Sequence, residues 1–229
     1  LGPWERLWAS PEAAGELEDA ALPACAPEGR EAFRERVPEL LRALRRQAEQ
    51  TIGQPLGFER LDALVPRWLA AAAQRPNPLL ALERTLPVLQ TVLRRTTYLV
   101  LLWENPGALD HLPRLAEGAK GLADTLARHP ILLDGLLDGR SLVVPPTAER
   151  LRQALDAHVQ SLPPGDLEQA LDELRYFKEA TLLRIGACEL AGAMPTAKVS
   201  DALTALAELL CERTLNLAWE ETIARYGAP

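Results

Sequence analysis

Residues 165–226 read GDLEQALDELRYFKEATLLRIGACELAGAMPTAKVSDALTALAELLCERTLNLAWEETIARY and hold the longest helical patterns of the chain. A first helix is expected to begin after the N-cap candidate Asp166, and its apolar residues recur every three or four positions, which places them on one face. This stripe comprises Leu167, Leu171, Leu174, Phe177, Thr181, Ile185 and Cys188. Gly192 and Pro195 predict the end of this helix.

The second helix of this stretch is expected to start at Ser200 or Asp201, either of which can cap it, and to reach Tyr226. One apolar stripe comprises Val199, Leu203, Leu206, Leu210, Leu217 and Ala224. A neighbouring stripe comprises Cys211, Leu215, Trp219, Ile223 and Tyr226. Because a helix that is apolar over so wide an arc is packed on two sides, we expect it to run through the centre of a bundle.

Two charged residues, Lys178 and Glu189, fall inside the apolar arc of the first helix. They lie three turns apart, roughly 16 Å along the axis, so they cannot pair with each other. Together with Arg184 at the edge of the arc, they are our candidate contacts to a partner or a neighbouring domain. The alternative is structural: an ion pair within the fold, or a side chain that extends to water.

The rest of the chain shows helical periodicity and no strand pattern, which predicts an all-α fold, an irregular multi-helix bundle with two long C-terminal helices. The other expected helices are a short one near the start, then 28–50, 58–73, 77–104, 106–116, 119–128, 130–138 and 148–161, the last of them capped by Thr147. Pro38 should kink or break its helix, and Pro87 should kink the helix that contains it. We divide the chain into an N-terminal helical linker segment, 1–76, and a bundle, 77–229.

Composition limits the class of protein. The 229 residues are 48% hydrophobic and carry a net charge of −7, which fits a globular protein and argues against nucleic-acid binding. No apolar run approaches the ~18 residues of a membrane span, and the start lacks the features of a signal peptide. Three cysteines at unrelated spacings fit the cytoplasm. The first residue is not Met, which indicates an interior piece of a longer polypeptide or a trimmed one.

Motifs for chemistry are missing from the sequence. His111, His129 and His158 have no metal-ligand spacing with one another or with the cysteines. No phosphate-binding glycine loop and no nucleophile elbow occurs. We therefore assign no catalytic, cofactor-binding or metal-binding residue.

A set of short motifs in a fixed order gives the chain a family resemblance. They are Tyr98-Leu99, Glu104-Asn105-Pro106, Leu126-Ala127-Arg128-His129-Pro130, Leu132-Leu133-Asp134, Phe177-Lys178, Leu183-Arg184-Ile185 and Lys198-Val199-Ser200-Asp201. With these motifs the chain resembles the bifunctional glutamine synthetase adenylyltransferase/adenylyl-removing enzyme. The resemblance extends from about residue 61 to residue 227. The occurrence of all these motifs in order is more specific than any one of them.

The resemblance implies a longer cytoplasmic enzyme with two nucleotidyltransferase halves that use ATP and Mg²⁺. One half attaches AMP to a tyrosine of glutamine synthetase, the other removes it, and glutamine and the PII signalling protein regulate both. The chain corresponds to the part just before the adenylylating domain, whose paired aspartates would follow Tyr226-Gly227, so no catalytic residue is carried over. The family usually has Asp where this chain has Glu189.

The function that follows from the resemblance is that of a non-catalytic helical segment. It would couple the two nucleotidyltransferase halves and contact the domains beside it, with glutamine synthetase and PII as partners of the whole enzyme. Whether the segment alone is an enzyme stays open, although the parent polypeptide is one. The alternative is a passive scaffold or a helical adaptor with no ligand of its own.

Overall fold

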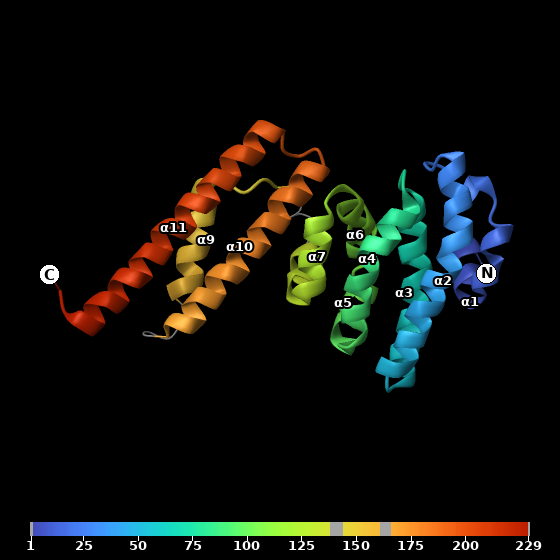
Figure 1. Cartoon of the computed structure of the whole chain (residues 1–229), viewed down its shortest axis with the longest axis horizontal. Helices are drawn as coiled ribbons and strands as arrows, with labels where there is room; N and C mark the ends of the chain where they lie inside the picture. Colours follow the sequence, from blue (N-terminus) through green and yellow to red (C-terminus); the bar gives the residue numbers. More distant parts are fainter. Residues whose placement is uncertain (1, 138–143, 161–165, 229) are drawn as a thin grey trace. The chain divides into compact units, whose positions relative to one another are not determined.

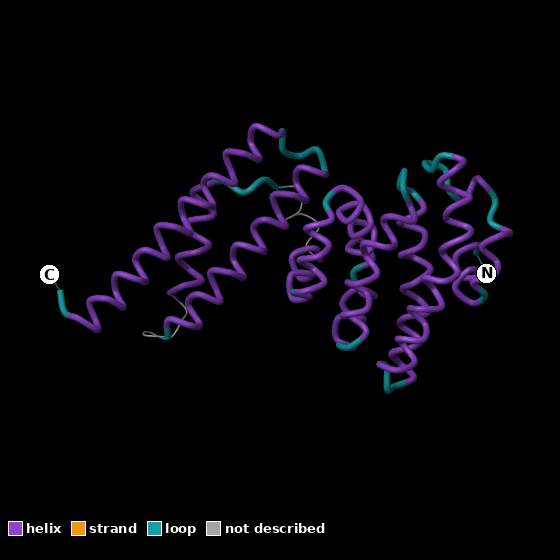
Figure 2. Tube along the Cα trace, in the orientation of Figure 1, coloured by secondary structure: helices purple, strands orange, loops and turns teal. Residues whose placement is uncertain are grey.

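A computed structural model describes residues 2–137, 144–160 and 166–228. Over these residues the chain consists of helices and their connecting loops, with no strand (Figure 2), so the all-α prediction is confirmed. The chain separates into two compact units, Leu1–Gly139 and Arg140–Pro229. The division into 1–76 and 77–229 stays a prediction about how the longer polypeptide is organised.

The first unit is a set of mostly antiparallel helices packed side by side (Figure 1). Its elements are α1 (Pro3–Ala9), η1 (Pro11–Glu16), η2 (Asp19–Ala21), α2 (Pro27–Thr51), α3 (Pro55–Ala73), α4 (Pro78–Leu93), α5 (Thr96–Glu104), α6 (Pro106–Gly118), α7 (Lys120–Arg128), η3 (Pro130–Leu132) and α8 (Leu133–Leu137). Helix α4 lies at the centre, in contact with α2, α3, α5, α6 and α7. Its buried side chains therefore form much of the core of this unit.

Prolines inside the helices do not break them, so the alternative of a break at Pro38 is wrong, while the kinks expected at Pro38 and Pro87 stay predictions. Helix α2 continues through Pro38 and α4 through Pro87. Each proline removes one backbone hydrogen bond, but the helix buries apolar side chains on both sides of it, and that packing holds the helix together. The long helix expected over 77–104 instead divides after Leu93, because Arg95 adopts an extended backbone conformation.

A buried polar contact joins α3 to α4. The Trp68 indole Nε1 donates a hydrogen bond of 2.7 Å to Oγ1 of Thr85, and that hydroxyl donates to the carbonyl of Ala81 at 2.7 Å. Both Trp68 and Thr85 are fully buried. An indole N–H buried without an acceptor would cost about 1–3 kcal/mol. Thr85 avoids this cost because its hydroxyl supplies the acceptor that the buried Trp68 needs.

The arginine-rich helix α2 holds the N-terminal segment. Arg34 donates from Nε and Nη2 to the carbonyl of Leu17, at 3.1 and 2.7 Å, and pairs with Asp19. Arg45 lies 4.4 Å from the ring centre of Trp8 and also donates to its carbonyl. These contacts supply donors to the Trp8 carbonyl, in the last turn of α1, and to the Leu17 carbonyl, which directly follows η1.

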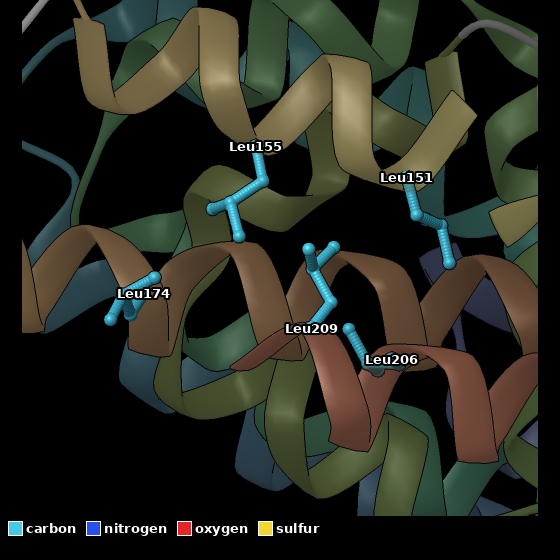
Figure 3. Packing of buried hydrophobic residues seen from close by; sticks show 5 residues of the cluster. All are labelled: Leu151, Leu155, Leu174, Leu206 and Leu209. Carbon is cyan, nitrogen blue, oxygen red and sulfur yellow. The ribbon is translucent and has the colours of Figure 1, made fainter. Parts of the chain in front are cut away.

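The described residues of the second unit form three helices, α9 (Ala148–Gln160), α10 (Leu167–Leu190) and α11 (Thr196–Tyr226). Figure 3 shows leucines of α9 pointing toward leucines of α10 and α11 across a shared core. This core comprises Leu151, Leu155, Leu174, Leu206 and Leu209. A second cluster beside the α10–α11 turn comprises Ile185, Cys188, Met194, Val199 and Ala202. The two long C-terminal helices are thus confirmed.

The ends of these helices follow local sequence signals in two of three cases. Asp166 caps α10 by accepting from the amide of Gln169 at 2.9 Å, as predicted. Thr147 Oγ1 accepts from the amide of Arg150 at 3.3 Å at the start of α9.

The predicted caps of α11 at Ser200 and Asp201 are wrong, because α11 begins directly after Pro195. The carbonyl of Pro195 already accepts from the amides of Lys198 and Val199, at 2.8 and 3.1 Å.

Candidate functional site

The candidate site lies in the second unit and begins with the Arg184 clamp, the pair of hydrogen bonds that Arg184 donates to the carbonyl of Val144. Nε and Nη2 lie 3.2 and 3.0 Å from this oxygen. Val144 precedes Pro145 and Pro146, which have no backbone N–H of their own to donate. The planar guanidinium, with its fixed donors, therefore ties this segment to α10 through its carbonyl.

A hollow of about 430 Å³ lies between this segment and the α10–α11 turn. Its lining is Pro145, Pro146, Thr147, Ala148, Ala193, Met194, Pro195, Lys198, Asp201, Ala202 and Ala205. Lys198 Nζ and Asp201 Oδ2 lie 3.1 Å apart and pair with each other. The volume is in the range of small-ligand sites. The lining offers apolar contact and one ion pair, which suits binding rather than bond-making chemistry.

The three residues predicted as contacts are not gathered in one place. Lys178 is half-buried, and its ammonium pairs with the neighbouring Glu179 at 3.2 Å. Glu189 is exposed, so its placement within the buried arc is wrong. Only Arg184 takes part in a contact between distant segments. Their roles toward a partner remain predictions.

The buried surface of α10 is wider than the predicted stripe. Four residues of the stripe are buried, but so are Leu183 and Ala187, which lie on nearly the opposite side of the helix at about 100° per residue. Arg184 is half-buried and lies between these two sides. Burial raises the pKa of the Cys188 thiol, and the nearby Arg184 guanidinium opposes that rise without cancelling it.

Helix α11 is buried along one face only, so the expectation that it runs through the centre of a bundle is wrong. The buried residues of α11 are Val199, Ala202, Leu206 and Leu209, all in its first half. We call the exposed residues Cys211, Leu215, Trp219 and Tyr226 the outer stripe. The side chains of the last three are 69%, 53% and 75% exposed. In Figure 1, α11 runs alongside α10 and extends past it toward the C-terminal end of α11.

One polar contact between α9 and α10 was missed from the sequence. His158 Nε2 and Glu173 Oε2 lie 2.5 Å apart, and the imidazole stacks on the Tyr176 ring with centroids 6.2 Å apart. From the sequence, His158 is expected at the boundary or on the surface of its helix, without a partner on another helix. Nothing local indicates this contact, because it depends on how α9 packs against α10.

Two further searches bear on the class of site. Among the residues that the structure describes, no group of three or more His, Cys, Asp and Glu side chains could hold a metal ion. Within the same ranges, no helix combines the length and the apolar character needed to cross a bilayer.

Comparison with known proteins agrees with the motifs. A family model described as glutamate-ammonia ligase adenylyltransferase matches residues 109–229. A bifunctional glutamine synthetase adenylyltransferase/adenylyl-removing enzyme of Pseudomonas putida is 44% identical over 232 residues, 100% of this chain and 23% of the relative. Enzymes of that name from Pseudomonas aeruginosa and Pseudomonas syringae are 49% and 47% identical over 176 residues, 77% of this chain and 18% of each relative.

The chain therefore spans about a quarter of the length of the Pseudomonas putida relative, although that relative matches the whole of it. The match includes the first 60 residues, where the sequence motifs were weak. The family model covers more than half of the chain, from α6 through α11. The chain belongs to the glutamate-ammonia ligase adenylyltransferase family.

Proposed function

We propose that this chain is a non-catalytic helical segment of an enzyme that adenylylates and deadenylylates glutamine synthetase, and that it couples the catalytic parts of that enzyme. The observation that carries the proposal is that the residues matched by the family model form helices, and that several of their polar side chains pair locally or between neighbouring helices. Arg152 with Glu212 is an ion pair between α9 and α11, and His158 contacts Glu173 between α9 and α10. Such pairs stabilise or position helices and do not form a reaction centre.

The partners and cofactors follow from the same proposal. Glutamine synthetase would be the substrate of the whole polypeptide, and PII and glutamine its regulators, in the cytoplasm. ATP and Mg²⁺ would be bound by its nucleotidyltransferase domains.

The chemical part of the proposal is tested by mixing the 229-residue chain with ATP, Mg²⁺ and glutamine synthetase. We expect no AMP transfer, whereas the full polypeptide should transfer AMP under the same conditions. Transfer by the 229-residue chain alone would refute the non-catalytic role.

The coupling role is tested in the full polypeptide with Leu206→Met, which alters packing between α11 and its neighbours while conserving volume. We expect a changed ratio of adenylylating to adenylyl-removing activity as glutamine is varied. Thr204→Ser, at an exposed position of the same helix, is the control. A passive scaffold would show the same ratio in both variants and no heat of binding with PII or glutamine.

A further inference from the structure

The outer stripe of α11 is an apolar surface without a partner in the described part of the chain. Leu215, Trp219 and Tyr226 follow at intervals of four and seven residues, so they share one helical face. This face lies opposite the residues that pack against α9 and α10. Isolated exposed hydrophobic residues are common, but a contiguous aromatic and aliphatic face is typical of a contact surface.

The charges around the outer stripe indicate what can cover it. Glu208 and Glu212 are exposed and lie seven residues before Leu215 and Trp219, so these two carboxylates share the face of the outer stripe. Arg225 lies at the C-terminal end of the stripe, 5.4 Å from the ring centre of Tyr226. Helices that lie on anionic membranes carry lysine and arginine on the polar face instead. The stripe therefore fits a protein surface with an apolar centre and a basic rim.

A second copy of this chain is a less suitable occupant of the outer stripe than another part of the same polypeptide. The stripe covers about 24 Å of helix and is ~10 Å wide, so it offers a few hundred Å², below the ~800 Å² per partner of stable interfaces. Two copies would also bring together surfaces of the same negative sign. A partner joined through the same polypeptide needs far less area, because linkage gives an effective concentration of about millimolar.

We infer that the outer stripe docks against another part of the same polypeptide, through an apolar surface with a basic rim. This inference rests on the proposed function, in which the chain is one segment of a longer enzyme. The relatives support it by their length, since this chain matches only 23% of the Pseudomonas putida enzyme and 18% of the Pseudomonas aeruginosa enzyme. Tryptophan and tyrosine, which lie at the centre and the end of the stripe, are enriched among the residues that dominate interface energies.

Cys211 provides a direct probe because it begins the stripe and is exposed, whereas Cys25 and Cys188 are buried. Iodoacetamide labelling of Cys211, followed by peptide mass spectrometry, is compared between the 229-residue chain and the full polypeptide that contains it. Docking should slow labelling of Cys211 at least about tenfold in the full polypeptide. Sedimentation of the 229-residue chain establishes that the reference is monomeric.

Paired variants distinguish docking from an indirect effect. In the full polypeptide, Leu215→Glu with Trp219→Glu should restore fast labelling of Cys211. Asn216→Glu with Ala224→Glu adds the same charge at exposed positions away from the stripe and should leave labelling slow. All four positions are exposed, and circular dichroism of the 229-residue chain checks that each variant keeps its helices.

Equal labelling rates in the two proteins would overturn the inference. Labelling of the 229-residue chain that is slow and speeds up on dilution would also overturn it, because a second copy would then cover the stripe. AMP transfer is measured separately on the same full polypeptide. Slow labelling without action on glutamine synthetase would defeat the proposed function and leave the docking inference standing.

Discussion

Arginine side chains that donate to backbone carbonyls recur in both units of the molecule. Arg34 holds the carbonyl of Leu17, and Arg184 holds that of Val144. In each case the recipient segment lacks regular structure, so its carbonyl has no helical partner. The guanidinium supplies the missing donors, and a lysine could not reproduce the paired geometry.

Arg184→Met is expected to loosen the segment that the clamp holds while leaving α10 intact. Loss of a hydrogen bond worth about 1 kcal/mol should speed hydrogen exchange at the first amides of α9, Arg150 and Leu151, roughly fivefold. Arg175→Met on the same helix is the control, since Arg175 pairs only along the exposed surface with Asp172. Equal exchange in the two variants would show that the clamp does not restrain this segment.

The pairing of Asp19 with α2 predicts a pH dependence. The hydrogen bond from Arg34, with the added charge of Arg30, holds the pKa of the Asp19 carboxyl below its ordinary range. A carboxyl whose pKa is lower in the folded state contributes stability above its unfolded pKa and loses it as the pH falls through the folded value.

The contact of the N-terminal segment with α2 around Asp19 should therefore weaken between about pH 4 and pH 2. Hydrogen exchange of η2 and the start of α2 between pH 6 and pH 2.5 measures this, after correction for the intrinsic rates. Asp19→Asn should remove most of the pH dependence, and Glu49→Gln, an exposed carboxyl elsewhere on α2, should not. A profile unchanged by Asp19→Asn would contradict the assignment.

Among the elements, the α10–α11 turn shows how a helix end is specified. Gly192 has φ +72°, and its amide donates to the backbone carbonyl of Glu189 at 2.8 Å. The amide of Ala193 donates to the backbone carbonyl of Cys188 at 2.9 Å. These two bonds form the Schellman motif, in which glycine takes the left-handed position at lowest cost. Pro195 then starts α11 without a side-chain cap.

Gly192→Ala is expected to destabilise the second unit by about 1 kcal/mol, because alanine is strained at positive φ. No atom lies within 4 Å of an added Cβ, so the cost is conformational and not steric. Gly192→Asn should recover part of the loss, since asparagine tolerates this region better. Urea denaturation followed by circular dichroism measures both variants, and a loss that is equal for alanine and asparagine would contradict this explanation.

The local sequence predicted where helices end more accurately than it predicted which segments pack against each helix. Asp166, Thr147 and Gly192 act on their own helix ends, so the sequence alone located them. The exposure of Leu215 and the clamp at Arg184 depend on which segments pack beside α10 and α11. Periodicity gives the apolar faces of a helix but not the number of neighbours it has, which is why the second stripe of α11 was assigned to a core.

At the scale of the whole molecule, the two units have separate cores. The leucine cluster around Leu155 draws only on α9, α10 and α11. The Trp68–Thr85 contact and the surroundings of α4 belong to the first unit. A polypeptide with cores divided in this way can unfold in two steps instead of one.

Leu155→Ala should destabilise the second unit by about 2–5 kcal/mol, the usual cost of removing a fully buried leucine side chain. The loss should appear in hydrogen exchange of α9 to α11 and leave exchange in α3 and α4 unchanged. Leu203→Ala, at an exposed position on α11, is the control. A loss of protection that extends equally to α3 and α4 would show that the chain unfolds as one cooperative unit.

The clamp on Val144 has a consequence for sequence variation in the family. Arg184 binds a backbone oxygen, which every amino acid supplies, and the Val144 side chain is itself 39% exposed. Selection on this contact would therefore act on position 184 and leave the side chain at position 144 free to change. Saturation mutagenesis should find many tolerated residues at 144 and few at 184, so two positions in direct contact would show no correlated substitution.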